Sequence, residues 1–264
     1  MSRIQVFIFI LLSGAARGQQ NLFNVPSSDI TLKNKPFFQQ QINFLNNGVY
    51  LFNSTFSFGP GNELEVGANA LGIVLDPNHN GSMLVTNSDF ANPPVYPFFT
   101  FNMQKAWKLN RSFKVALGTQ TGFSVGGHFG TYDYFNLVTA LTRYKLKLIT
   151  GLHYASDSLF GPEDRNPILH AAYNPIGFQL GFEMELLREK LLVIGEHISG
   201  SHSLGLSTLG FGLLASGHWV LSLGYQFTNG GGTPVPNGVV LEFTYVPSAT
   251  THRRIYHEGH PQVD

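Results

Sequence analysis

The chain has 264 residues, of which only 12% are charged, and its 16 basic and 16 acidic side chains cancel. Because charge is sparse and balanced, the basic surface of a nucleic-acid-binding protein is excluded, and no nucleic acid partner is expected. Cysteine is absent, which excludes disulfides, a lipoprotein anchor and thiolate metal sites. The 23 Phe and 29 Gly fit a β-barrel better than a soluble enzyme.

Residues 1–18 are predicted to be a cleaved signal peptide. A positively charged start, the short apolar run Val6–Leu12 and small residues at positions 16 and 18 precede a cleavage point ahead of Gln19. The run is shorter than the about 20 residues that a transmembrane helix needs. Residues 19–35 are polar and irregular, and they are predicted to be a periplasmic lead-in to the first strand.

From residue 36 to 246, apolar and polar residues alternate with a period of two, which is typical of β-strands. The segment at 220–228 is an example, since Leu221, Leu223, Tyr225 and Phe227 alternate with polar or small residues. No helical period and no second domain are indicated. The predicted strands, in chain order, are 36–46, 50–58, 64–70, 99–107, 113–120, 132–141, 146–154, 168–186, 191–199, 206–214, 220–228 and 239–245.

Alternation alone does not separate a soluble sandwich from a membrane barrel, but the connections do. Those near 59–62, 109–111, 142–145, 187–190 and 215–218 are short, and those at 76–94, 125–131, 155–167, 199–205 and 228–238 are mostly longer. Short periplasmic turns opposite long external loops are typical of outer-membrane barrels, and Trp107 and Trp219 beside short turns fit an aromatic girdle. The sequence predicts an all-β, closed antiparallel transmembrane barrel of about 12 strands in the bacterial outer membrane.

Several segments carry a resemblance to a known family. They are Asn24-Val25-Pro26-Ser27-Ser28, the stretch from Ser199 to Gly205, Gly224-Tyr225-Gln226-Phe227, and the closing GVVLEFTY. With these the chain resembles the bacterial outer-membrane β-barrels of the phenol meta-cleavage-pathway family of transporters. The resemblance implies a passive channel for small solutes, with outer-membrane lipid and the barrel-assembly machinery as partners. One departure is the C-terminal tail, 247–264, because such barrels end on an aromatic residue and here Tyr245 is not the last.

The polar residues of the strands are predicted to line the lumen. Lys145 and Lys147 begin one strand where Glu183 and Glu185 end its neighbour, so ion pairs between the strands are expected. These residues act either as a structural charge ladder or as a constriction that selects solutes by charge, and the two roles are compatible. The complete predicted set is Glu63, Glu65, Gln104, Lys114, Lys145, Lys147, Glu183, Glu185, Glu196, Gln226 and Glu242, and its six glutamates outnumber its three lysines.

Two other functions remain open. His197 and Ser199 share a strand face, as a base and the hydroxyl that it activates must, and outer-membrane lipid hydrolases resemble this pattern, although those families usually have Asn where Gly200 stands. A structural or adhesive barrel, with its function in the external loops, is the other alternative. His252, His257 and His260 lack the spacing of a metal site. We therefore expect a channel without enzymatic activity, cofactor or metal.

Overall fold

The computed structural model describes residues 20–89, 93–161, 175–188, 190–215, 218–229 and 235–247. The predicted signal peptide and all but the first residue of the C-terminal tail lie outside these ranges. Short helices are η1 (Thr142–Tyr144) and α2 (Asp157–Phe160). The strands are β1 (Pro36–Leu45), β2 (Tyr50–Gly61), β3 (Leu64–Leu75), β4 (Leu84–Val85), β5 (Phe98–Lys108), β6 (Phe113–Ser124), β7 (Phe129–Leu141), β8 (Leu146–Ala155), β9 (Ile176–Leu187), β10 (Leu191–Ile198), β11 (Leu206–Leu214), β12 (Trp219–Thr228) and β13 (Gly238–Tyr245).

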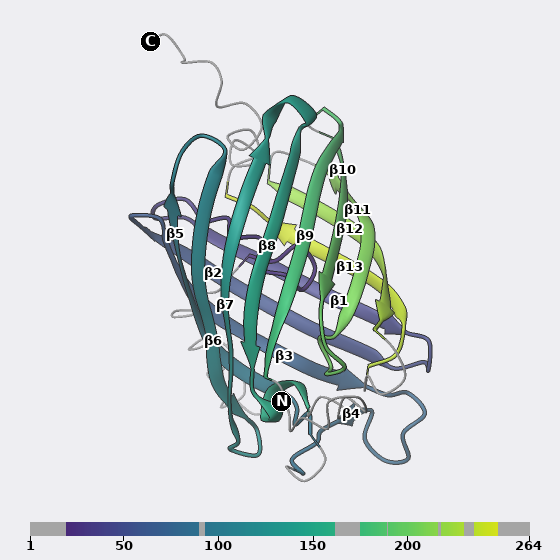
Figure 1. Cartoon of the computed structure of the whole chain (residues 1–264). Helices are drawn as coiled ribbons and strands as arrows, with labels where there is room; N and C mark the ends of the chain where they lie inside the picture. Colours follow the sequence, from purple (N-terminus) through teal and green to yellow (C-terminus); the bar gives the residue numbers. More distant parts are fainter. Residues whose placement is uncertain are drawn as a thin grey trace, which may run out of the picture.

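Twelve of these strands form a closed antiparallel ring (Figure 1). Each strand pairs with the next along the chain, β3 pairs with β5, and β1 pairs with β13 to close the barrel. The two-residue strand β4 lies outside the ring, paired with the end of β3. The predicted all-β closed barrel of about 12 strands is confirmed.

The two faces of the wall have opposite polarity. Outward-facing Phe101 and Leu223 are 51% and 55% exposed, whereas inward-facing Gln104 and Gln226 are 1% and 0% exposed. A soluble protein hides its apolar face, so this reversed arrangement is that of a barrel surrounded by lipid. In the part of the chain that the structure describes, no helix is long and apolar enough to cross a membrane.

The connections differ at the two ends of the barrel. Short turns follow β2, β5, β7, β9 and β11, and the longer connections follow β3, β8 and β12 at the other end. Trp107 and Trp219, each 46% exposed, lie on the outside near the short-turn end. Trp219 contacts Tyr245 edge to face, with their ring centroids 5.3 Å apart, so aromatic side chains form part of the outer surface at this end.

Two sequence predictions are corrected here. Glu63, predicted in the lumen, is exposed in the turn between β2 and β3, because Asn62 and Glu63 both adopt positive φ (57° and 53°) and form the turn themselves. Residues 20–31, predicted to lie in a periplasmic lead-in, are instead inside the barrel, where Phe23, Val25 and Ser28 are 1%, 0% and 0% exposed. We call residues 20–31 the inner segment.

Candidate functional site: a plugged lumen and an external cavity

The inner segment turns back on itself inside the barrel. Asn21 pairs with Pro26 in an isolated antiparallel bridge, and the Leu22 N–H donates to the Val25 carbonyl at 2.8 Å. The Ser27 N–H donates to the Gln20 carbonyl at 3.0 Å. This tight turn leaves the N–H groups at its tip without partners inside the segment, so the wall must supply acceptors.

Glu196 of β10 supplies them. Its carboxylate accepts hydrogen bonds from the N–H groups of Phe23, Asn24 and Val25 at 3.1, 2.9 and 2.8 Å. The Asn24 side-chain amide donates a further bond at 2.7 Å. A charged acceptor that receives four donors in a buried setting makes strong hydrogen bonds. Glu196 is therefore the main polar anchor of the tip.

Apolar side chains of the tip pack against the wall. Leu22, Phe23 and Val25 form one buried cluster with wall residues that include Ile149 and Ile194. Inward-facing glycines make room for two of them. A Cβ at Gly181 would lie 2.6 Å from Leu22 Cδ1, and a Cβ at Gly224 would lie 2.9 Å from Phe23 Cζ. The wall is thus shaped for this segment.

A second anchor, Glu65 of β3, holds both ends of the inner segment. It accepts hydrogen bonds from the Gln20 N–H at 3.1 Å and from the Gln20 side-chain amide at 3.2 Å. The Thr31 N–H and hydroxyl also donate to it, as does Gln104 at 3.1 Å. Because Glu65 is 0% exposed, these donors are what satisfies its carboxylate in place of water.

The third anchor is a group of ion pairs around Asp29 of the inner segment. Lys147 Nζ lies 2.7 Å from Asp29 Oδ2 and 3.5 Å from Glu183 Oε2, and Lys114 Nζ lies 3.2 Å from Asp29 Oδ1. Lys147 is only 1% exposed, so the loss of a partner would leave a buried charge uncompensated. The segment and the wall are electrostatically interdependent.

The predicted lumen residues have several different placements. Lys145 and Glu185 form an ion pair with each other near the short-turn end. Gln226 bonds Asn43 and the Pro236 carbonyl, and Glu242 accepts from Thr244. Of the predicted set, those that contact the inner segment or a group bonded to it are Glu65, Gln104, Lys114, Lys147, Glu183, Glu196 and, through Gln39, Glu242. Sequence reasoning missed Gln20, Asn24, Asp29 and Thr31, which carry the segment's side of these contacts.

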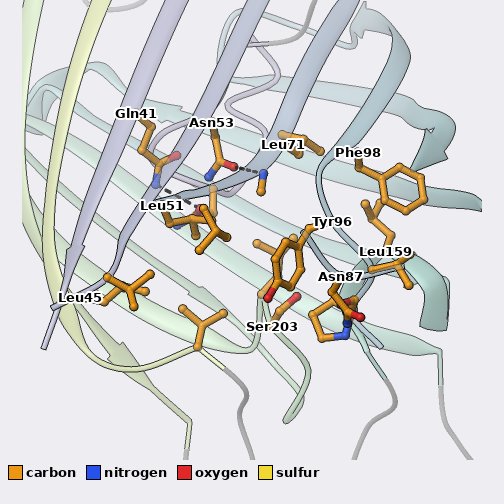
Figure 2. A pocket seen from close by; sticks show the side chains of 18 of the residues that line it. Gln41, Leu45, Leu51, Asn53, Leu71, Asn87, Tyr96, Phe98, Leu159 and Ser203 are labelled. Atoms are coloured by element: carbon orange, nitrogen blue, oxygen red, sulfur yellow. Dashed lines mark hydrogen bonds between the residues drawn. The ribbon is translucent and has the colours of Figure 1, made fainter. Parts of the chain in front are cut away.

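At the long-loop end the barrel holds a cavity of about 460 Å³ (Figure 2). Its floor includes Asn21, Phe23 and Asn24 of the inner segment. Its walls come from β1, β2, β3 and β5, and connections between strands contribute Tyr96 and Ser203. Gln41 of the wall donates to Asn24 Oδ1 at 3.3 Å, which joins wall and floor. The inner segment therefore closes the cavity from below.

The lining of the cavity carries little charge. Among the described residues that line it, Asp76 is the one charged side chain. Amide side chains such as Gln41 and Asn53 alternate with aliphatic and aromatic ones such as Leu51 and Phe98 (Figure 2). Burial raises the pKa of the Tyr96 hydroxyl, so it stays protonated and able to donate a hydrogen bond. The site offers hydrogen bonds and apolar contact, but little charge.

The structure does not pair His197 with Ser199. His197 Nδ1 lies 2.9 Å from the hydroxyl of Ser207 on β11, and the Ser199 hydroxyl accepts a bond from the Phe178 N–H at 2.8 Å. Of the residues described, no group of three or more His, Asp or Glu is placed to hold a metal ion. His252, His257 and His260 lie outside the described residues.

No protein-family model matches the sequence, and no curated protein matches it. Among solved structures, the fold is similar to that of the NanC porin in a rhombohedral crystal form, with a TM-score of 0.51 and 10% identity, covering 81% of this chain and 100% of that one. A match to the outer membrane channel DcaP of Acinetobacter baumannii has a TM-score of 0.31 and 10% identity, covering 82% and 99%. At this identity the NanC likeness concerns the barrel fold, and the DcaP match is too weak to add to it.

Proposed function

We propose that this protein is a passive outer-membrane channel for small solutes, closed in this structure by its own inner segment. The observation that carries the proposal is the placement of residues 20–31 across a polar lumen, below a cavity at the long-loop end. A barrel with a lipid-facing apolar surface and a polar interior is the architecture of a membrane pore. The fold shared with a protein described as a porin supports the same reading.

The finer assignment, to the transporters of the phenol meta-cleavage-pathway family, rests on motifs that now have structural roles. Asn24 and Val25 form the tip that Glu196 holds, and Gly224 makes room for Phe23. Residues 32–35 connect the inner segment to β1 at the short-turn end. Withdrawal of the segment toward that end, the periplasmic side of such a barrel, is the motion that clears the lumen.

The test compares the mature wild-type barrel with a variant that lacks residues 20–31, both in planar bilayers and in liposomes. We expect low ion conductance and slow swelling with a neutral sugar for the wild type, and clear increases for the deletion. Deletion of residues 248–264 is the matched control, because it shortens the chain and leaves residues 20–31 intact. Heat-dependent electrophoretic mobility verifies that each barrel is folded. Folded deletion barrels that pass neither ions nor sugar would refute a channel.

The opened pore should prefer cations weakly. Without Asp29, the described wall has five inward glutamates against three lysines, namely Glu65, Glu183, Glu185, Glu196 and Glu242 against Lys114, Lys145 and Lys147. Low-dielectric walls strengthen the attraction between this excess of negative charge and a permeating cation. The preference should fade near molar salt, where the screening length is about 3 Å. Reversal potentials in a salt gradient across the bilayer measure it, and an anion preference contradicts this charge count.

Lipid hydrolysis is the second candidate, and one observation favours it. His197 and Ser207 form a close pair on the strand face opposite to inward-facing Glu196 and Thr208, so the pair faces lipid. Among the described residues, however, no carboxylate or amide side chain is hydrogen bonded to His197 to orient it, as a catalytic histidine usually requires. Phospholipid or lipid A hydrolysis that disappears in both His197→Ala and Ser207→Ala would establish an enzyme instead of a simple channel.

A further inference from the structure

We infer that the external cavity is a binding site for an uncharged amphipathic small molecule, with an apolar body and one or a few hydrogen-bonding groups. The inference deepens the proposed function. It rests on that function in one respect, because it treats the cavity as the first binding site that a solute meets on its way through the channel. The argument uses the cavity's size, the distribution of charge in the barrel, and the chemistry of its lining.

The size fits a single small molecule. Ligand sites are typically concave spaces of about 300–1,000 Å³ with mostly apolar linings and a few polar groups, and the cavity volume is about 460 Å³. Leu51, Leu71, Phe98 and Leu159 provide apolar surface from four separate elements (Figure 2). A molecule in the cavity would therefore be surrounded by apolar contacts rather than held against one wall.

The charges of the barrel interior are not available to a ligand in this cavity. Glu196 is bonded to the tip of the inner segment, Glu65 to its two ends, and Asp29 to Lys114 and Lys147. A charged ligand would have to leave water for a lining that has Asp76 as its one described ionised side chain, and burial of an uncompensated charge is costly. This argues against anions and against most cations.

A purely apolar ligand fits no better. The lining includes the side-chain amides of Asn21, Gln41 and Asn53 and the hydroxyl of Tyr96. The Tyr96 hydroxyl can both donate and accept a hydrogen bond, and Tyr96 lies at the cavity beside the amides (Figure 2). Polar groups left without a partner are unfavourable, so a ligand that carries a hydroxyl or amide gains there over a hydrocarbon of the same shape. The cavity thus selects for a neutral molecule that can form a hydrogen bond.

The experiment uses four probes that share one shape and differ at one end: phenylbutanol, phenylbutyrate, phenylbutylamine and butylbenzene. Each is titrated by calorimetry into the full mature barrel in lipid nanodiscs, with empty nanodiscs as the blank. We expect saturable binding of phenylbutanol, and binding of both charged probes weaker by about tenfold or more, which corresponds to at least about 1.4 kcal/mol. Equal or tighter binding of either charged probe overturns the proposal.

Two variants locate the binding. Leu51→Trp fills the cavity and should abolish phenylbutanol binding, whereas Phe52→Trp, the next residue on β2 with its side chain on the outer face, should leave it unchanged. Tyr96→Phe removes a hydroxyl from the lining and should reduce the preference for phenylbutanol over butylbenzene by up to about tenfold, the contribution of one hydrogen bond. Binding that Leu51→Trp does not alter, in a barrel shown to be folded, overturns the site. If that variant does not fold, an unchanged preference in Tyr96→Phe does so.

The outcome is separable from the channel proposal. If the barrel without residues 20–31 conducts ions but the wild type shows no saturable phenylbutanol binding, the channel stands and the binding site is rejected. If binding is saturable and sensitive to Leu51→Trp while the deletion variant conducts nothing, the site stands and the channel function is rejected.

Discussion

Glu196 gives the sharpest test of whether the inner segment is held as the structure shows. Glu196→Ala removes the acceptor of four donors, which are the N–H groups of Phe23, Asn24 and Val25 and the Asn24 side-chain amide. With the segment in place, these donors stay buried without partners. A buried unsatisfied donor costs about 1–3 kcal/mol, so even the lower value for each destabilises the closed state by about 4 kcal/mol. The withdrawn population should rise by about a thousandfold.

The matched control is Glu185→Ala, another inward glutamate, whose carboxylate pairs with Lys145 instead of the segment. The Lys145 side chain is 36% exposed, and a partly exposed ion pair contributes about 1 kcal/mol or less. Because the chain has no cysteine, Ser27→Cys introduces a unique thiol in the inner segment. The rate at which a bulky, membrane-impermeant maleimide labels it reports withdrawal. Equal labelling rates in the two glutamate variants would refute this account of the anchor.

Three further predictions follow from other parts of the barrel. If Leu223 lies near the bilayer midplane, Leu223→Arg should cost about 2–4 kcal/mol of folding free energy in urea titrations in lipid, and Leu109→Arg at a short turn about 1 or less; equal costs contradict the membrane placement. Gly181→Ala should displace Leu22 and raise the rate at which maleimide labels the thiol introduced by Ser27→Cys in the inner segment. An unchanged labelling rate would mean that the Gly181–Leu22 contact does not hold the segment in place. Burial lowers the pKa of His202 from 6.5 to about 4, and its Nδ1 accepts the Leu204 N–H. The folded form therefore resists protonation, so thermal stability should be full above pH 6.5 and fall toward pH 4, and His202→Asn should flatten that profile.

The barrel itself could be predicted because its signal is local. In a strand, neighbouring side chains point to opposite faces, so the alternation around Leu223 and Gln226 specifies both the element and its orientation. The same reasoning placed Lys147 and Glu183 on facing strands, and they are register partners in the structure. It failed at Glu63, because the turn with positive φ at Asn62 and Glu63 extends one residue beyond the predicted 59–62, which takes Glu63 out of the alternation.

The inner segment could not be predicted by this reasoning, because it has no period. Its contacts join residues far apart in sequence, such as Asn24 and Glu196. Two weaker signals were present in the chain. One was the apolar pair Leu22 and Phe23 within a polar stretch, and the other was an inward position occupied by glycine, as at Gly224. An inward glycine leaves space in a lumen, and something must fill that space.

The predicted pair of His197 and Ser199 failed for a reason of geometry. Strand β10 ends at Ile198, so Ser199 lies beyond the alternation, and its hydroxyl accepts a hydrogen bond from the Phe178 N–H instead of lying beside His197. Directly opposed residues on neighbouring strands have Cβ atoms about 4.5–5.5 Å apart. Ser207, the register partner of His197 on β11, is therefore the serine that the ring reaches.

The chemistry of the anchors explains how a segment can be held firmly and still be released. The inner segment is bound to the wall largely through carboxylates, two lysines and backbone N–H groups, and water can replace every one of these partners once the segment withdraws. Exchange of protein partners for water reduces the net contribution of such a bond to a charged group to about 1.5–3 kcal/mol, below its strength in a dry site. A segment held by apolar packing alone would lose about 25 cal/mol for each Å² exposed, with nothing gained from solvation. A polar lumen therefore allows the inner segment to be held in one specific closed position and still to withdraw at a moderate cost in free energy.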